Sequence, residues 1–218
     1  MAKSRVLKEL ANNTISLEIA LNRLLIIASD IGNAELSDWA EHELKGYENE
    51  RVPDYRIAKN TLITYNGNNG IYKISNAPLP LKQLYDSEDP ELFYVSITDS
   101  IGTIEKYNIG PKQGKMIRDL TMFAGYVLNK TGIACTSISQ IIPDNVFENI
   151  VNTVKTTLIK IFIELDKTYG CLDDLDVDIV TVDEKTIDNT NEKINKYIYI
   201  DQSVKIGDGN KISESEIK

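Results

Sequence analysis

The chain has 218 residues, of which 42% are hydrophobic and 26% are charged. These proportions are ordinary for a globular protein, and the length predicts one domain or one domain with an appendage. The net charge of −9, from 24 basic and 33 acidic residues, argues against broad binding to nucleic-acid backbones, which needs clustered Lys and Arg.

The apolar segments and the cysteines indicate a protein of the cytoplasm. Residues 1–10, MAKSRVLKEL, carry charge without the apolar segment of a signal peptide. The longest strongly apolar run, residues 24–29, is far shorter than the roughly 20 residues of a membrane span. Cys135 and Cys171 form no CxxC pair, and we expect both to be reduced thiols.

Helical periodicity dominates the N-terminal part of the chain. Residues 4–31 place apolar side chains at three- and four-residue steps, with a weak point where Asn13 or Thr14 could cap a second helix. Residues 34–48 repeat the pattern. The short connection at 32–34 therefore predicts an antiparallel helical hairpin.

A β-prone region follows the helical hairpin. Residues 55–65 and 71–75 flank the Asn- and Gly-rich run 66–70, which predicts a β-hairpin with a long loop. The further predicted elements are, in order, a third strand within 92–98, a short helix at 101–107 that starts at Asp99 or Ser100, a strand or helix at 115–129, and a β-like segment at 136–142.

The C-terminal third contains the longest predicted helix, residues 145–169, which Gly170 ends. Between Glu164 and Glu192 the chain carries ten acids and two lysines, a net charge of −8, so residues 171–193 are interpreted as an acidic linker or an edge segment. In residues 194–218, isoleucines alternate with polar residues, which predicts a β-hairpin-like tail.

The predicted fold class is α+β. It combines an N-terminal helical hairpin, a small antiparallel β-sheet, a long closing helix and a C-terminal β-forming tail. The predicted organisation is an α+β domain over residues 1–170, the acidic segment 171–193, and the tail 194–218. A lone hairpin of this size is marginal, so the tail is expected to mediate self-association, chiefly through its apolar side chains Ile198, Ile200, Val204, Ile206 and Ile212.

Several segments form an ordered pattern. Residues 35–47, ELSDWAEHELKGY, contain a W-x-x-x-E-L-x-G-Y element, and residues 52–56, VPDYR, contain a P-x-Y-R element. Residues 95–105 and the helix within 138–166 follow in the same order. Over about residues 3–170 the chain thus resembles the AbiTii family of bacterial abortive-infection proteins. The resemblance implies a role in defence against phage, and it supplies no catalytic residues.

The first of these segments contains the most distinctive candidate site. Trp39, Glu43 and Tyr47 step by four and are expected on one helical face. Tyr55 and Arg56 follow, and Arg56 could reach back to Glu43 in a charge-assisted bond beneath aromatic cover. Two interpretations stay open: these five residues form a core that joins the helices to the first strand, or they form a pocket or surface that binds a partner.

Other polar motifs have weaker functional interpretations. Glu41, His42 and Glu43 are adjacent on a helix and point in different directions, and the chain has one histidine, so a zinc motif of the HExxH type is not formed. The aspartates within 173–178 lack the glycine of a calcium-binding loop. The glycine runs 67–70 and 207–209 lack the ending of a phosphate loop. We therefore expect no metal, no cofactor and no enzymatic activity.

The leading hypothesis is a non-catalytic, cytoplasmic defence protein. It would recognise a phage component or control a toxic effector through protein contacts, and it would form a homo-oligomer through its tail. One alternative is a metal-dependent, nuclease-like enzyme built from scattered carboxylates. Another is a self-assembling structural module. Membrane and nucleic-acid partners are not expected.

Overall fold

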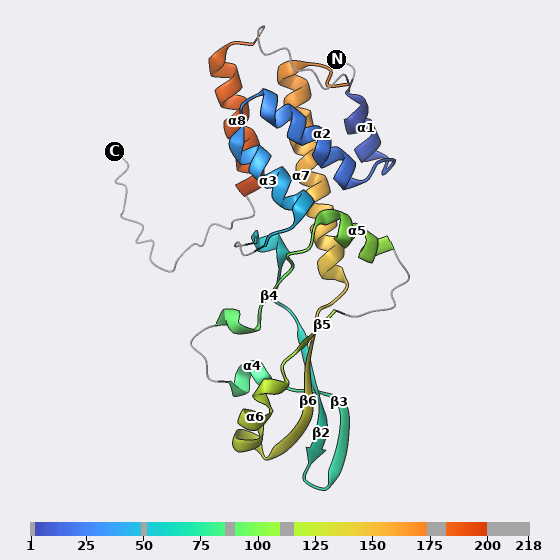
Figure 1. Ribbon diagram of the computed structural model, residues 1–218, viewed down its shortest axis with the longest axis vertical. Coiled ribbons are helices and arrows are strands. Elements are labelled where there is room, and N and C mark those ends of the chain that lie inside the picture. Colours follow the sequence, from blue (N-terminus) through green and yellow to red (C-terminus); the bar gives the residue numbers. More distant parts are fainter. Residues whose placement is uncertain (1–2, 49–51, 86–89, 110–115, 174–181, 200–218) are drawn as a thin grey trace, which may run out of the picture.

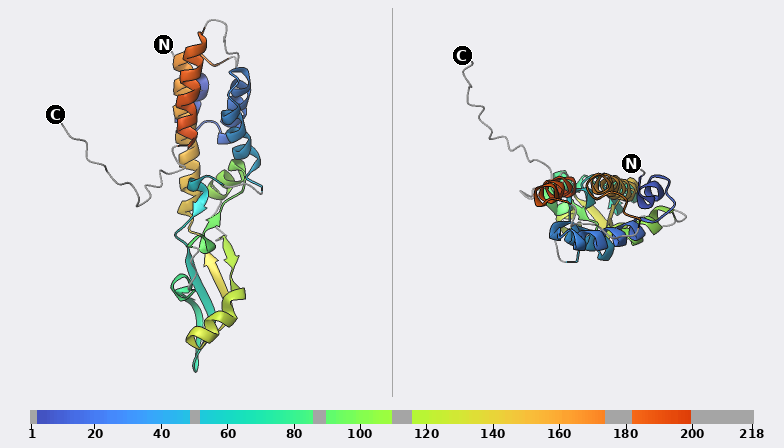
Figure 2. Two further views of the ribbon diagram at one scale, coloured as in Figure 1. Left: turned by 90° about the vertical axis from the view of Figure 1, so that its left-hand side faces the viewer. Right: turned by 90° about the horizontal axis from the view of Figure 1, so that it is seen from above.

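The computed structural model describes residues 3–48, 52–85, 90–109, 116–173 and 182–199. It is elongated, with a helical lobe at one end and a sheet lobe at the other (Figure 1). Seen from above, α1, α7 and α8 form one layer of the helical lobe, and α2 and α3 form the other (Figure 2). The predicted α+β class, with its helical hairpin, antiparallel sheet and long helix, is confirmed.

The N-terminal segment contains three helices: α1 (Arg5–Ala11), α2 (Leu17–Asp30) and α3 (Ala34–Lys45). Antiparallel packing of α2 and α3 confirms the predicted hairpin, and the Asn33 side chain caps α3 by accepting from the Leu36 N–H at 3.0 Å. The cap of α2 was predicted wrongly. Ser16, rather than Asn13 or Thr14, accepts from the Ile19 N–H at 3.3 Å, because the chain first passes through a left-handed turn at Asn13.

The main sheet has four antiparallel strands in the order β3-β2-β6-β5: β2 (Leu62–Asn69), β3 (Tyr72–Pro78), β5 (Ile117–Asp119) and β6 (Ile133–Ile141). The β2–β3 hairpin was expected, but its turn is only Gly70-Ile71, shorter than the predicted loop. Gly67 remains within β2 beside a bulge. A Cβ there would lie 2.0 Å from the Ala134 oxygen, so this glycine permits close strand approach instead of a turn.

The other elements before residue 110 are short: η1 (Asp54–Arg56), β1 (Ile57–Ala58), α4 (Leu81–Leu84), η2 (Pro90–Phe93), β4 (Val95–Ser96) and α5 (Ile101–Ile109). The expected third strand within 92–98 is only β4, which pairs with β1 in a separate two-stranded sheet. The helix predicted at 101–107 is α5, and Ser100 accepts from the Thr103 N–H at its start. The ambiguous region 115–129 includes β5, η3 (Thr121–Phe123) and most of α6 (Ala124–Thr131).

The long helix α7 (Asn145–Tyr169) has the predicted bounds, and Gly170 follows it with a φ of 84°. The next described element, α8 (Glu184–Tyr199), was not predicted. It overlaps the proposed acidic linker and the start of the proposed β-tail, so both interpretations are wrong for residues 184–199. Asp183 caps α8 by accepting from the Thr186 N–H at 3.0 Å. The remainder of the predicted tail, residues 200–218, lies outside the described residues.

Each lobe has its own hydrophobic core. The helical core includes apolar side chains of α1, α2, α3, α5, α7 and α8, and the sheet core lies between the sheet and α4 and α6. Because Ile194 and Ile198 of α8 are buried in the helical core, α8 is part of that lobe rather than an appendage. In the part of the chain that the structure describes, no helix has the length and apolar character needed to cross a membrane.

Candidate functional site

The structure brings the five residues of the predicted cluster together where α3 meets η1. Trp39 and Glu43 lie on α3, and Tyr55 and Arg56 lie on η1. Tyr47 lies beyond the end of α3, so the expectation that it continues the helical face is wrong. Gly46 ends the helix with a φ of 97°, and the Tyr47 N–H then donates to the Thr98 oxygen at 2.9 Å.

The carboxylate of Glu43 is the centre of this cluster and is completely buried. Its Oε1 accepts from the Tyr55 hydroxyl at 2.6 Å, from the Tyr47 hydroxyl at 2.8 Å and from Arg56 Nε at 3.1 Å. Its Oε2 accepts from Arg56 Nη2 at 2.5 Å. Four hydrogen bonds and an opposite charge therefore replace the water that burial removes.

Arg56 is also completely buried and extends the network to the segment after β4. Its Nη1 donates to the backbone oxygens of Ile97 at 3.1 Å and Asp99 at 2.7 Å. Its guanidinium carbon lies 4.8 Å from the centre of the Tyr47 ring. Burial by itself lowers the pKa of Arg56, but the charge and hydrogen bonds of Glu43 outweigh it and raise the pKa above its ordinary value.

The two tyrosine hydroxyls are held as hydrogen-bond donors. Burial, followed by the charge of Glu43, raises the pKa of Tyr47 and of Tyr55 well above the usual range. Both hydroxyls therefore keep their protons at neutral pH. Tyr55 also accepts a hydrogen bond from Trp39 Nε1 at 3.2 Å, so the indole is connected through Tyr55 to the buried carboxylate.

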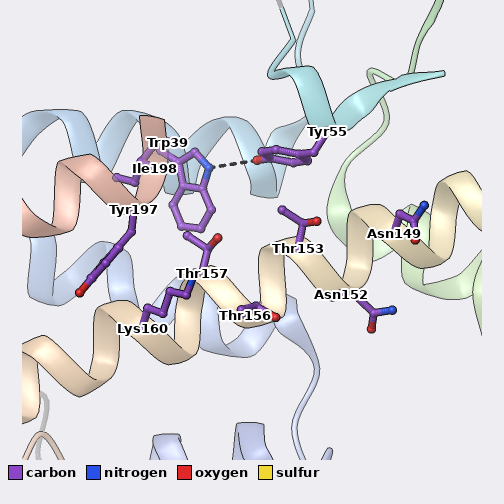
Figure 3. Close-up of a pocket in the computed structure, with 10 residues that line it drawn as sticks. All are labelled: Trp39, Tyr55, Asn149, Asn152, Thr153, Thr156, Thr157, Lys160, Tyr197 and Ile198. Atoms are coloured by element: carbon purple, nitrogen blue, oxygen red, sulfur yellow. Dashed lines mark hydrogen bonds between the residues drawn. The ribbon is translucent and has the colours of Figure 1, made fainter. Parts of the chain in front are cut away.

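Trp39 and Tyr55 form one wall of a cavity of about 370 Å³. Its floor is a face of α7, and α8 closes one end (Figure 3). We call this cavity the α7 groove, and its lining residues are Trp39, Tyr55, Asn149, Asn152, Thr153, Thr156, Thr157, Lys160, Tyr197 and Ile198. Of the predicted cluster, Trp39 and Tyr55 line the groove. Glu43 accepts a hydrogen bond from Tyr55 behind this wall, and Tyr47 and Arg56 donate to Glu43.

The α7 face that forms the floor was not predicted as a site. Its residues recur at three- and four-residue steps: Asn149, Asn152, Thr153, Thr156, Thr157 and Lys160. The apolar side chains of α7, including Val154 and Leu158, are buried in the helical core. A signal was nevertheless present in the sequence, because the polar face is largely Asn and Thr, whereas an exposed helical face usually carries many charges.

Apart from Ile198, which lines the groove, the other sequence candidates lie elsewhere or have separate partners. Glu41 pairs with Lys45 at 2.5 Å, and the His42 ring stacks on Tyr47 with centroids 5.2 Å apart. Ile198 was predicted to pair as a strand, but it is buried in α8 at the end of the groove. The remaining self-association candidates, Ile200, Val204, Ile206 and Ile212, are outside the described residues.

Possible metal ligands in the described residues are dispersed. Cys135 is half-buried in the sheet lobe and Cys171 is exposed, and both are free thiols. Across residues 3–48, 52–85, 90–109, 116–173 and 182–199, no three His, Cys, Asp or Glu side chains gather as a possible metal site. What the described site offers is a groove with an aromatic wall, uncharged polar groups and one lysine, Lys160.

Comparison with known proteins identifies a family. The model of the AbiTii family matches residues 4–193, which extends beyond the region of resemblance noted in the sequence and includes much of α8. No curated protein and no solved structure matches the chain.

Proposed function

The chain belongs to the AbiTii family, and on this premise we propose that it acts in abortive infection as a non-catalytic protein that recognises another protein. The family is associated with abortive infection and antiviral defence. The partner in this proposal is a phage component or a toxic effector whose activity the chain controls. The α7 groove is the proposed contact surface.

The observation that carries this proposal is the arrangement of Trp39 and Tyr55. The indole donates to Tyr55, and Tyr55 donates to the buried Glu43 carboxylate at 2.6 Å. Two aromatic side chains are therefore held in place before any partner arrives. Aromatic anchors in well-packed surroundings contribute much of the binding energy of protein interfaces, and a preformed surface loses less conformational entropy on binding.

A phage challenge tests the proposed role. Cells with and without the gene would be infected with a broad phage panel, and plaque formation would be counted. We expect fewer or smaller plaques in the presence of the gene for at least one phage. Unchanged plaque formation across the panel would count against the role in defence.

A variant pair tests whether the groove carries that role. Asn152→Arg places a bulky cation on the groove floor at an exposed helical position, and we expect protection to be lost. Asn189→Arg is the matched control, because it makes the same exchange at an exposed position of α8 that does not line the groove. Equal protection by both variants, at equal protein abundance, would show that the groove is not used.

A further inference from the structure

We propose that the α7 groove binds an extended peptide segment of a partner protein, with an acidic side chain of the peptide against Lys160. This inference rests on the proposed function and specifies the chemistry of its partner. It follows from the floor of the groove, its walls and its charge.

The floor offers polar groups that suit a peptide backbone. The Asn and Thr side chains of the floor are exposed or half-buried, so their amides and hydroxyls are accessible to a ligand. A side-chain amide has both donors and acceptors, and it can therefore pair with the N–H and C=O of a peptide group. From Asn149 to Lys160 the helix rises about 16 Å, which is the length of roughly five extended residues.

The walls offer faces for one larger side chain. In the close-up, the Trp39 ring lies over Thr157 and Tyr55 lies near Thr153 (Figure 3). The indole N–H is already donated to Tyr55, and Trp39 is 6% exposed, so only a small apolar part of its ring borders the groove. An aromatic or leucine side chain of the peptide would fit against the half-buried Tyr55, at the Thr153 end of this wall.

The charge of the groove indicates where an acidic side chain of the peptide would lie. Among the residues that line the groove, Lys160 alone carries a formal charge. Its ammonium lies 5.9 Å from the centre of the Tyr197 ring, at the end formed by α8. A single exposed cation suits one carboxylate, whereas phosphate clamps usually combine several cations or backbone amides. Thr153, beside Tyr55, is two helical turns from Lys160, which places the apolar and acidic side chains of the ligand about three residues apart.

The test uses the full chain and a library of capped pentapeptides that vary at every position. We expect enrichment of peptides in which Glu or Asp stands about three residues from Phe, Tyr, Trp or Leu. Lys160→Glu should reverse the preference at the acidic position toward Lys or Arg, with a change in relative affinity of roughly fivefold or more. Lys185→Glu makes the same charge change at an exposed position outside the groove, and the preference for an acid should stay unchanged.

Three results would overturn the inference. The first is a library without enrichment, or enrichment that Lys160→Glu does not alter. The second is tighter binding of mononucleotides than of any peptide, since this would assign the groove to a nucleotide. The third is tightest binding by a synthetic peptide of residues 200–218, because the groove would then belong to the chain's own C-terminal segment. If the library fails while Asn152→Arg still abolishes phage protection, the proposed function stands and only the peptide assignment is lost.

Discussion

Burial of Glu43 and Arg56 removes two opposite charges from water, a step that costs several kcal/mol for each ion. The cost is offset because every polar atom of the Glu43 carboxylate accepts a hydrogen bond and Arg56 also donates to two backbone oxygens. The pair therefore stabilises the fold only as a complete network. A lysine in place of Arg56 would not reproduce the geometry of these hydrogen bonds.

Arg56→Met should lower the free energy of unfolding by roughly 3–5 kcal/mol, because it leaves the Glu43 charge buried without its counterion. Urea denaturation followed by circular dichroism measures the change. The double variant Glu43→Gln with Arg56→Met should cost less than the sum of the two single variants, since neither charge then remains. Glu41→Gln, which removes the exposed partner of Lys45, is the control and should have a much smaller effect. Additive single effects would contradict coupling within the network.

At the scale of helices and strands, the sequence located those elements whose apolar pattern had one interpretation. The helices α3 and α7 have four-residue stripes ended by Gly46 and Gly170. The helix α8 was missed, because Ile194, Tyr197 and Ile198 fit a helix while Ile198 and Ile200 also fit an alternating strand. Burial of Thr190, Ile194 and Ile198 along one face shows which pattern is used.

The sequence predicted the Trp39–Arg56 cluster of the candidate site but not the α7 floor. Trp39, Glu43 and Arg56 are close in sequence, and the complementary charges of Glu43 and Arg56 indicated their contact. The α7 floor is more than 90 residues further along the chain, and nothing in its sequence specifies which wall it faces. Contacts of this kind depend on how whole helices pack, which local patterns do not encode.

Gly46→Ala should destabilise the protein more than Gly32→Ala. Both glycines have positive φ, 97° and 66°, so each alanine is strained by roughly 1–2 kcal/mol. A Cβ at Gly46 would also lie 2.6 Å from the Thr98 oxygen, whereas a Cβ at Gly32 has nothing within 4 Å. Thermal unfolding of the two variants measures the difference. Equal melting temperatures would show that the contact between the end of α3 and residues 98–100 is easily displaced.

Glu105 of α5 connects two helices, since both of its carboxylate oxygens lie 3.2 Å from the Leu17 N–H at the start of α2. Burial is the main reason that the pKa of Glu105 is raised above its ordinary value of 4.5. A raised pKa in the folded state means that folding favours the protonated form. The stability contribution is therefore complete below about pH 4.5 and is lost as the pH rises through the folded pKa.

The wild type should consequently gain stability relative to Glu105→Gln as the pH falls from 7 toward 4.5. Urea midpoints of both proteins at several pH values measure this difference. Asp119→Asn is a control of opposite sign, because hydrogen bonds from Thr121 lower the pKa of Asp119, and its contribution is lost at acidic pH. A pH-independent difference for Glu105→Gln would contradict the raised pKa.

At the scale of the whole molecule, the two cores explain which parts of the chain depend on one another. The helical core includes residues from Val6 to Ile198, so its two sequence ends meet in one lobe. The backbone N–H of Ser4 also donates to the buried Asp166 of α7 at 3.0 Å. The buried residues of the sheet core lie between Ile63 and Ile138. In sequence, they therefore lie between segments that belong to the helical lobe.

A chain that ends at Gly170 should unfold at a lower temperature than a chain that ends at Tyr199. The shorter chain lacks Ile194 and Ile198, which are buried at 0% and 8% exposure, and it uncovers the apolar surface they contact on the helical lobe. Differential scanning calorimetry of both chains measures this. Equal melting temperatures would show that α8 is dispensable and would restore a domain boundary near residue 170.

Self-association through residues 200–218 remains a prediction from their alternating isoleucines. A cut at Tyr199 is the suitable test, because an earlier cut would remove part of α8. Multi-angle light scattering should give a larger number of subunits for the full chain than for the chain ending at Tyr199. The same oligomeric state in both would remove the tail from the assembly.

The chain contains a single Trp, and that indole forms the wall of the α7 groove while donating its N–H to Tyr55. Tryptophan fluorescence of the protein therefore comes from this one position. A compound that binds against the indole should change the wavelength or yield of the emitted light. The protein thus carries an intrinsic optical probe, and ligands can be titrated without attaching a dye.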